Sequence, residues 1–309
     1  GDVYKRQDKN KGIFQQRANI PEEAGFVTNP YTNIGGMESW GFDGNITFNH
    51  NFTKDFGMTV RGNWTFARNN VTYWEQSGVV YPYQSFVDVP YGVQRGLISL
   101  GLFKDQADIN NSPIQTFSTV YPGDLKYKDQ NGDNRIDELD VVPMGYNTIC
   151  PELFYSMGFD FEYKGLGINA QFQGAGHYTI QRSLSCFYAP LMNNQTISEH
   201  YLENCWRSGK DNTDAIYPRL TTTESANNYR GNSVFMKNIS FLKLRSAEIY
   251  YKLPESCIKP LRLREFKLFA KGMDLFSIDN VNETDPEVIW STYPCLLYTS
   301  PSPRDISGS

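Results

Sequence analysis

Two adjoining stretches of this chain alternate strictly between apolar and polar residues. In residues 155–163 the odd positions are Tyr, Met, Phe, Phe and Tyr, and the positions between them are Ser, Gly, Asp and Glu. The alternation resumes in residues 166–172, after the Lys164-Gly165 dipeptide, which is short enough for a tight turn. Period-two alternation places apolar side chains on one face of a strand and polar side chains on the other. The two stretches therefore predict a β-hairpin.

The same alternation recurs elsewhere. It is present in residues 40–48 and again in residues 58–66, on either side of a short polar stretch at residues 51–55. Two further candidates, residues 239–252 and 265–276, are less regular. The phase of the first of these changes near Arg245, where a β-bulge would absorb one extra residue. Antiparallel strands therefore account for much of the chain.

Strands of this length suit a membrane. A membrane strand needs about 9 to 11 residues, with one face on lipid and the other on a polar lumen. A soluble β-sandwich also alternates, but its strands are shorter and its apolar faces meet in a dry core. The predicted fold is all-β: a partial antiparallel transmembrane β-barrel, an incomplete curved sheet of roughly seven to nine strands with long extracellular loops. The expected lipid-facing residues are Met157, Phe159, Phe161, Ile168 and Phe172.

Composition supports this class and excludes others. Aromatic residues make up 15% of the chain and charged residues 20%, which is unusual for a soluble enzyme of this size. The net charge of -5 and the absence of a basic cluster disfavour nucleic acid as a partner. No run of eighteen apolar residues predicts a membrane-spanning helix. His50, His177 and His200 lack metal-ligand spacing, and no catalytic motif is present.

Both ends of the chain stand apart from the rest. Residues 1–7 and residues 295–309 resemble translated sequencing-adapter DNA, so we do not expect them to be part of the natural fold. Residues 8–294 remain as one unit, which we expect to be the C-terminal part of a barrel from a longer protein.

A twelve-residue acidic loop has the spacing of a calcium site. Oxygen-bearing side chains occupy positions 1, 3, 5, 9 and 12, and the residue at position 7 contributes its carbonyl. The candidate ligands are Asp129, Asn131, Asp133, Arg135, Asp137 and Asp140. The loop departs from the EF-hand pattern in having Asn134 at position 6 and Asp140 at position 12. The alternative is a solvated acidic turn whose side chains bond their own backbone.

Aromatic residues gather in residues 69–90. If the 164–165 turn is periplasmic, as short turns are in such barrels, strand parity places this stretch and the acidic loop on the extracellular side. Aromatic side chains there are candidates for stacking on sugar faces, and the alternative is packing within the loop or a membrane girdle. The candidate substrate contacts are Tyr73, Trp74, Tyr81 and Tyr83.

Short motifs follow one another along the chain. They include Tyr121-Pro122-Gly123-Asp124, Asp129 to Asp133, Tyr163-Lys164-Gly165, Phe172-Gln173-Gly174, Trp206, Tyr217-Pro218-Arg219-Leu220, Phe241-Leu242-Lys243-Leu244, Tyr251-Lys252-Leu253-Pro254 and Asp285-Pro286-Glu287. Together these segments resemble the C-terminal barrel of the SusC/RagA family of TonB-linked outer-membrane transporters. The resemblance covers essentially all of residues 8–294.

The resemblance implies a barrel of about 22 strands, plugged by an N-terminal domain, in the bacterial outer membrane. Such transporters import glycan or peptide fragments, work with a SusD-like surface lipoprotein and draw energy from the TonB complex through an N-terminal box. Measured against that pattern, we expect the signal peptide, TonB box, plug, early strands and final strand to lie outside this sequence. No enzyme activity and no required cofactor are implied, and calcium would have a structural role.

Two other functions fit parts of the pattern. A secreted or surface calcium-dependent glycan-binding β-module would show a dry core between two sheets, whereas a transporter would show a hydrophobic belt of about 25 Å. A polysaccharide-degrading enzyme would show a pair of carboxylates converging in a cleft.

Overall fold

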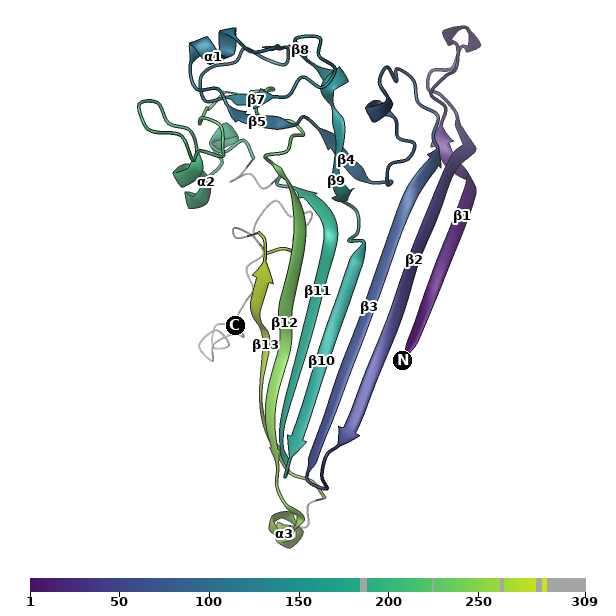
Figure 1. Ribbon diagram of the computed structural model, residues 1–309, viewed down its shortest axis with the longest axis vertical. Helices are drawn as coiled ribbons and strands as arrows, with labels where there is room; N and C mark the ends of the chain where they lie inside the picture. The colour runs from purple at the N-terminus through teal and green to yellow at the C-terminus, as the bar shows by residue number, and fades with distance from the viewer. Residues whose placement is uncertain (184–187, 224, 262–263, 282–284, 288–309) are drawn as a thin grey trace, which may run out of the picture.

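The computed structural model describes residues 1–183, 188–223, 225–261, 264–281 and 285–287. One seven-stranded antiparallel sheet dominates it, with the strand order β1-β2-β3-β10-β11-β12-β13 (Figure 1). Its strands are β1 (Asp2–Gln16), β2 (Tyr31–Asn51), β3 (Phe56–Tyr73), β10 (Leu153–Tyr163), β11 (Leu166–Gln181), β12 (Met236–Lys252) and β13 (Lys267–Asp279). These strands are neighbours in the order in which the chain reaches them. The predicted all-β partial barrel wall is confirmed.

The remaining elements are short. The small strands are β4 (Val93–Gly96), β5 (Ser99–Leu102), β6 (Ile114–Gln115), β7 (Leu125–Tyr127), β8 (Arg135–Ile136) and β9 (Val142–Asn147). The helices are η1 (Glu22–Ala24), η2 (Pro82–Gln84), α1 (Gln106–Asn110), η3 (Glu138–Asp140), η4 (Met192–Asn194), α2 (Glu199–Asn204), α3 (Glu255–Ile258) and η5 (Lys259–Leu261). None of the described helices has the length and apolar character needed to cross a membrane.

The predicted hairpin is confirmed as β10 and β11. Tyr163 pairs with Leu166 across a two-residue turn, and both turn residues have positive φ, 50° at Lys164 and 84° at Gly165. Two-residue turns of this kind need positive φ because their twist then matches that of the strands. A Cβ on Gly165 would also lie 2.6 Å from the carbonyl oxygen of Lys252. Glycine is therefore required there both by conformation and by space.

The bulge predicted near Arg245 is also confirmed. The pairing of β12 passes from Leu244 to Ser246 on both sides. Arg245 is the extra residue against β11, whereas against β13 the two residues Asp274 and Leu275 lie opposite Arg245. A second bulge lies in β11, where the pairing passes from Ala175 to Tyr178. This bulge explains why β11 continues to Gln181, beyond the end of the sequence alternation: it resets the phase of the strand.

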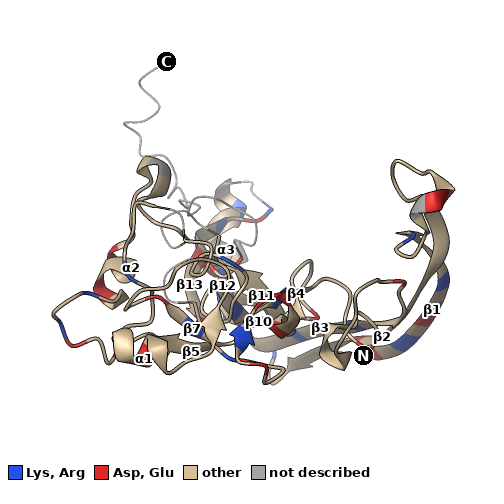
Figure 2. Cartoon of the chain, turned by 90° about the horizontal axis from the view of Figure 1, so that it is seen from above, with Lys and Arg blue, Asp and Glu red and all other residues tan. Residues whose placement is uncertain are grey.

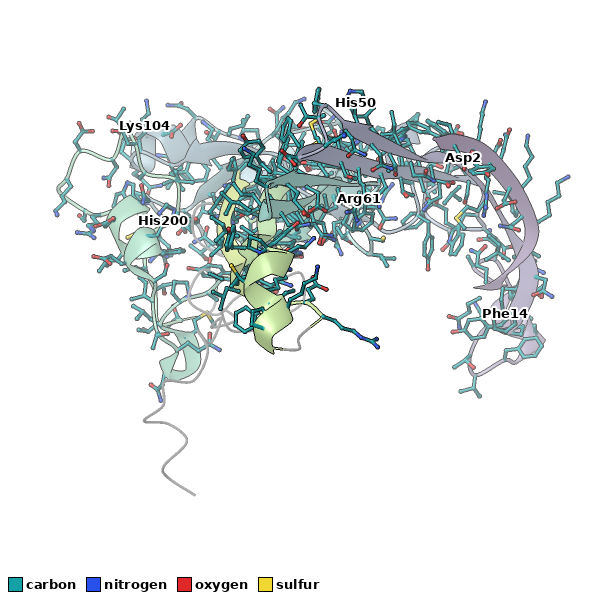
Figure 3. The ribbon with its side chains drawn as sticks, turned by 90° about the horizontal axis from the view of Figure 1, so that it is seen from below. Asp2, Phe14, His50, Arg61, Lys104 and His200 are labelled. Carbon is teal, nitrogen blue, oxygen red and sulfur yellow. The ribbon has the colours of Figure 1, made fainter. Side chains whose placement is uncertain are left out.

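The two faces of the sheet differ in chemistry. One row across neighbouring strands consists of Phe48, Val60, Phe159, Ala170 and Ala247. The adjacent row consists of Asn49, Thr59, Asp160, Asn169 and Glu248. His50 projects from the convex side and Arg61 from the concave side (Figure 3). The convex face is therefore the apolar one.

The expected lipid-facing residues all lie on this apolar face. Met157 and Ile168 are exposed, and Phe159 and Phe172 are half-buried against each other within the same sheet. The other described sheets have two strands each, so no second large sheet covers them. The arrangement agrees with a surface that faces lipid.

The N-terminal strand was not expected from the alternation. β1 includes residues 2–7, and every residue from 2 to 12 is exposed. This stretch adds backbone pairing with β2 but no core. The division at residues 1–7 and 8–294 stays a prediction, and residues 295–309 lie outside the described part.

The connections differ between the two ends of the sheet. The turn end carries residues 52–55, 164–165 and 253–266, and the loop end carries residues 17–30, 74–152 and 182–235 (Figure 1). At the loop end, β4 to β9 and α2 form a folded body that we call the outer-loop unit. Seen from above, this unit lies beside β10 to β13, whereas β1 is at the far side of the sheet (Figure 2).

A charged side chain should be tolerated on the concave face and not on the convex one. In the full-length protein, Met157→Arg is expected to destabilise the barrel in lipid by about 2–4 kcal/mol, because arginine loses its hydration there. Gln171→Arg is the matched control, since Gln171 is exposed on the polar face and pairs with Gly158, next to Met157. The measurement is urea unfolding in lipid vesicles, and equal effects of both changes would contradict the assignment of the faces.

Candidate functional site

The outer-loop unit has a hydrophobic core of its own. We call this cluster the loop core, and its residues are Leu97, Leu125, Tyr127, Ile136, Tyr201, Cys205, Tyr217 and Phe235. The rings of Tyr201 and Tyr217 stack with centroids 4.4 Å apart. These residues come from two loops, 74–152 and 182–235, which are far apart in the sequence. The two loops therefore fold as one unit.

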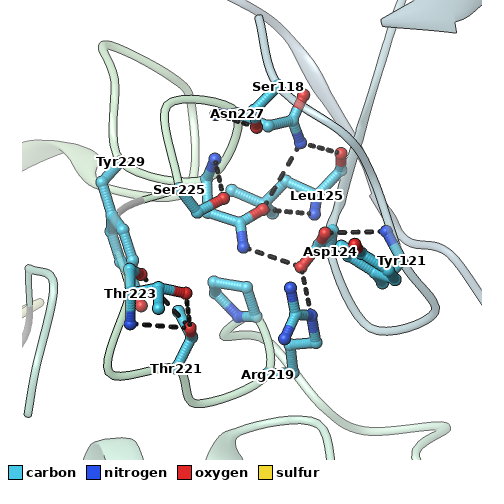
Figure 4. Close-up of polar contacts among 12 residues, drawn as sticks. Ser118, Tyr121, Asp124, Leu125, Arg219, Thr221, Thr223, Ser225, Asn227 and Tyr229 are labelled. Atoms are coloured by element: carbon cyan, nitrogen blue, oxygen red, sulfur yellow. Dashed lines mark hydrogen bonds and ion pairs between the residues drawn. The ribbon is translucent and has the colours of Figure 1, made fainter.

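Asp124 is the centre of a buried polar network in this unit (Figure 4). Its carboxylate is fully buried and accepts three hydrogen bonds, from Arg219 Nε at 2.7 Å, Asn228 Nδ2 at 2.9 Å and the Tyr121 amide at 2.8 Å. Because a buried carboxylate is costly without partners, these bonds are what make its burial acceptable. The network joins the first long loop to the second.

A second part of the network surrounds Asn227. Its side chain accepts from Gln115 Nε2 at 2.6 Å and donates to the Leu125 carbonyl at 3.0 Å. Its own carbonyl accepts the Tyr127 hydroxyl at 2.6 Å. Burial raises the pKa of Tyr127, so the hydroxyl remains a proton donor. Every bond in this group links the first loop with residues 227–232 or holds the first loop together.

A glycine and a tryptophan close the contact between the loops. Gly123 has φ of 87°, and a Cβ there would lie 2.4 Å from the Trp206 ring. The Gly123 carbonyl accepts the Arg219 amide at 2.9 Å, and the Arg219 guanidinium lies 4.9 Å from the Tyr121 ring centroid. The motifs at residues 121–124, 206 and 217–220 therefore meet in space.

The candidate calcium loop is held by its own backbone bonds. Asp129 accepts the amides of Gly132 at 2.6 Å and Asn134 at 2.8 Å, and Asp133 accepts the Arg135 amide at 2.8 Å. Asn134 has φ of 63°, the left-handed conformation that asparagine tolerates. Such bonds are expected if the loop is a solvated acidic turn whose side chains bond their own backbone, which was the alternative to a calcium site.

The second half of the loop is a capped turn. Asp137 accepts the Leu139 amide at 2.8 Å. Asp140, which is buried, accepts the amides of Gln130 at 2.7 Å and Asp137 at 2.9 Å. Arg135 lies in β8, which pairs with β6, and its side chain is exposed. Within the described residues, no group of three or more His, Cys, Asp or Glu side chains is arranged to hold a metal ion.

The four candidate substrate contacts do not form one surface. Tyr81 and Tyr83 stack on each other with centroids 5.4 Å apart, and the Tyr83 hydroxyl donates to the Leu139 carbonyl at 2.7 Å. Burial and the carboxylate of Asp140 raise the pKa of Tyr83. These two rings pack within the loops, next to the acidic turn.

Tyr73 and Trp74 lie elsewhere. Tyr73 is exposed and is the last residue of β3, so the strand extends into the stretch 69–90 that was expected to be a loop. Trp74 packs against Tyr91 with ring centroids 5.9 Å apart, and it lines a pocket with residues of the 17–30 loop. The role of Trp74 as a substrate contact stays a prediction, and the sequence did not identify the residues that share this pocket with it.

The concave face carries the other polar cluster. Arg61 Nη2 donates to Asp160 Oδ2 at 2.7 Å, and Asn169 Nδ2 donates to the same oxygen at 2.9 Å. Nearer the loop end, Lys243 Nζ donates to Asp285 at 2.6 Å and to Glu287 at 2.9 Å. This wall offers hydrogen-bonding groups to whatever fills the concave side.

The Asp124 network was missed by reasoning from sequence. Its members are neutral amides and one ion pair without any recognisable spacing. The sequence did place Asp124 and Arg219 in two family motifs, residues 121–124 and 217–220. It gave no indication that these two motifs are in contact.

Removing the Asp124 carboxylate should loosen both loops together. In the full-length protein, Asp124→Ala is expected to cost about 3–5 kcal/mol, because Arg219 and the Asn228 amide lose a buried partner. Amide hydrogen exchange should then rise in residues 97–140 and in residues 201–235. The control is Glu138→Ala, which removes an exposed ion pair with Arg230 and should cost less than about 1 kcal/mol. Faster exchange in only one loop would contradict a shared unit.

Comparison with known proteins gives a consistent result, although no protein-family model matches the chain. TonB-dependent receptor P3 of Formosa agariphila is 24% identical over 281 residues, covering 87% of this chain and 27% of the relative. TonB-dependent receptor P26 of the same organism is 23% identical over 282 residues, with the same coverages. The chain thus spans about a quarter of the length of these relatives.

Solved structures share the fold. The RagAB peptide transporter superposes with a TM-score of 0.64 at 16% identity, covering 92% of this chain and 31% of that chain. The RagAB peptide importer in its "closed-closed" state gives a TM-score of 0.60 at 16% identity, with coverages of 89% and 29%. The sequence matches and the shared fold together support the resemblance: the chain is similar to TonB-dependent receptors and has the fold of the RagAB transporter, as expected of a SusC/RagA-type fragment from the bacterial outer membrane.

Proposed function

We propose that this chain forms part of the wall and outer loops of a barrel that imports glycan or peptide oligomers across the outer membrane. The observation that carries the proposal is the two-faced sheet. Its convex face is apolar and its concave face holds Arg61, Asp160 and Asn169 in hydrogen bonds. A polar wall behind a lipid-facing surface is what a passage for hydrophilic cargo needs.

The same proposal includes two partners. A SusD-like surface lipoprotein would contact the outer-loop unit, and the TonB complex would act through parts of the protein outside this chain. The outer-loop unit exposes large apolar side chains, which are available for contact with another protein. They are Leu100 at 58%, Ile114 at 71%, Tyr121 at 52% and Ile216 at 53% exposure.

The two-sheet alternative is less well supported. A calcium-dependent glycan-binding module would bury its apolar faces between two sheets. In the described part of the chain the seven-stranded sheet has only two-stranded companions, which cannot cover it. An enzyme is also disfavoured, since the relatives carry the names of receptors and transporters.

Deletion of the full-length gene in its source bacterium should abolish growth on the imported oligomer. The screen uses panels of oligosaccharides and oligopeptides as sole carbon or nitrogen sources, with a monosaccharide as the control for general fitness. Reintroducing the gene should restore growth, because uptake of large hydrophilic cargo requires the barrel. Unchanged growth on every oligomer in both panels would rule out the importer.

We further propose that calcium stabilises the acidic loop. The side chains of Asp129, Asn131 and Asp133 surround one turn, with Asn131 Nδ2 donating to Asp133 Oδ2 at 3.0 Å. A carboxylate oxygen that accepts one amide retains a further lone pair for an ion. Asp137 and Asp140 would have to exchange their amide bonds for metal bonds, so binding would reorganise the second half of the loop. Calcium here would brace a loop and perform no chemistry.

Calorimetric titration of the chelator-treated full-length protein with calcium tests this. One binding event is expected in the wild type, and Asp133→Ala should weaken it at least tenfold, because one charged ligand is lost. Asp105→Ala is the control, since Asp105 lies in the same long loop and only caps α1. No heat of binding in the wild type would leave the self-bonded acidic turn as the explanation of the motif.

A further inference from the structure

A pocket at the loop end lies apart from the outer-loop unit. It is lined by three segments: the end of β1, the 17–30 loop with the start of β2, and residues 74–77 after β3. Its lining includes Phe14, Arg17, Tyr31, Trp74 and Glu75. Because the 17–30 and 74–152 loops leave the same end of the sheet, the pocket opens on the side where cargo would arrive.

Aromatic rings form one wall of the pocket. Phe14 and Tyr31 stack with centroids 4.9 Å apart and an interplanar angle of 13°. They are 65% and 59% exposed, so the outer ring faces remain open to solvent. Trp74 adds a third ring, which is half-buried against Tyr91. The exposed ring faces at this pocket are therefore available to a ligand.

An ordered set of polar groups forms the other wall. Arg17 Nε donates to Glu75 Oε2 at 2.8 Å, and the Ala18 amide donates to the same oxygen at 3.0 Å. The Gln15 side chain bonds the Glu75 backbone in both directions, accepting its amide at 3.1 Å and donating to its carbonyl. These bonds fix the polar groups before any ligand arrives, which lowers the entropic cost of binding.

The charge of this wall is balanced. The Arg17 hydrogen bond holds the pKa of Glu75 below its usual range, so the carboxylate is ionised and paired with the guanidinium. The guanidinium uses Nε for this bond and carries four further N–H donors. The pocket therefore offers hydrogen bonds without a net charge that would select an ionic cargo.

We propose that this pocket is a subsite for a neutral oligosaccharide. The proposal rests on the importer function and specifies which class of cargo the importer binds. A sugar ring has an apolar C–H face that packs on an aromatic face, and hydroxyls at its rim that bond planar polar groups such as Arg17 and Glu75. A peptide held through its backbone would need an open row of amide donors and carbonyl acceptors. The pocket instead presents rings and side chains.

The test uses the purified full-length protein and an array of neutral oligosaccharides, with an oligopeptide array beside it. At least one neutral glycan should bind, and Phe14→Ala and Tyr31→Ala should each weaken its affinity about tenfold. Tyr31→Phe keeps the ring and should retain most of the affinity. Phe26→Ala is the matched control, because Phe26 is 60% exposed in the same loop and does not line the pocket. Each variant is first checked for wild-type levels of folded protein in the outer membrane.

Three outcomes would overturn the proposal: no neutral glycan binds, only peptides bind, or Phe14→Ala and Tyr31→Ala bind as tightly as Phe26→Ala. These outcomes differ from a failure of the importer function. If the pocket variants bind and import normally while the gene deletion abolishes growth, the receptor is an importer and the subsite lies elsewhere. If the deletion has no effect on growth, the function itself fails.

Discussion

The backbone hydrogen bonds of the seven-stranded sheet are the constraint on which the rest of the structure depends. Hydrocarbon offers no partner to an amide or a carbonyl, so each strand that crosses a membrane must pair along its length. The seven strands of the large sheet do so through six consecutive antiparallel pairings. Among the described residues, β1 and β13 pair on one side each. A closed barrel leaves no such edges.

Once the backbone is paired, the side chains are free to divide by face. Apolar residues such as Phe159 lie on the convex side, whereas Arg61 and Asp160 form their ion pair on the concave side. Beyond the membrane this division no longer applies, because water can satisfy the backbone of a loop. The outer-loop unit therefore has few ladder bonds and depends on side chains, with Asp124 and Asn227 bonding segments about a hundred residues away. Backbone hydrogen bonds thus hold the sheet together, whereas side-chain hydrogen bonds hold the outer-loop unit together.

Sequence reasoning succeeded where the physical signal is local. The turn at Lys164-Gly165 and the extra residue at Arg245 follow from periodicity, which a single stretch of chain displays. It failed where the signal is not local. β1 carries charged residues on an exposed edge strand and shows no alternation, and the partners of Asp124 become visible only when two long loops meet. The pocket beside Trp74 was hidden for the same reason, since Phe14 and Tyr31 line it from two other strands.

The motifs that marked the family turn out to be contacts between distant segments. Gly123 packs against Trp206, Asp124 bonds Arg219, and Lys243 bonds Asp285. Motif residues of this kind hold distant segments in contact. They therefore indicate how the segments pack together and not which ligand they bind. The pocket at Phe14 and Tyr31 uses none of these motifs. β1, which carries Phe14, lies at the opposite side of the curved sheet from the outer-loop unit (Figure 2). Because the contacts that hold the loops together lie apart from the residues that line the pocket, the pocket residues can differ between cargoes while the contacts between the loops stay the same.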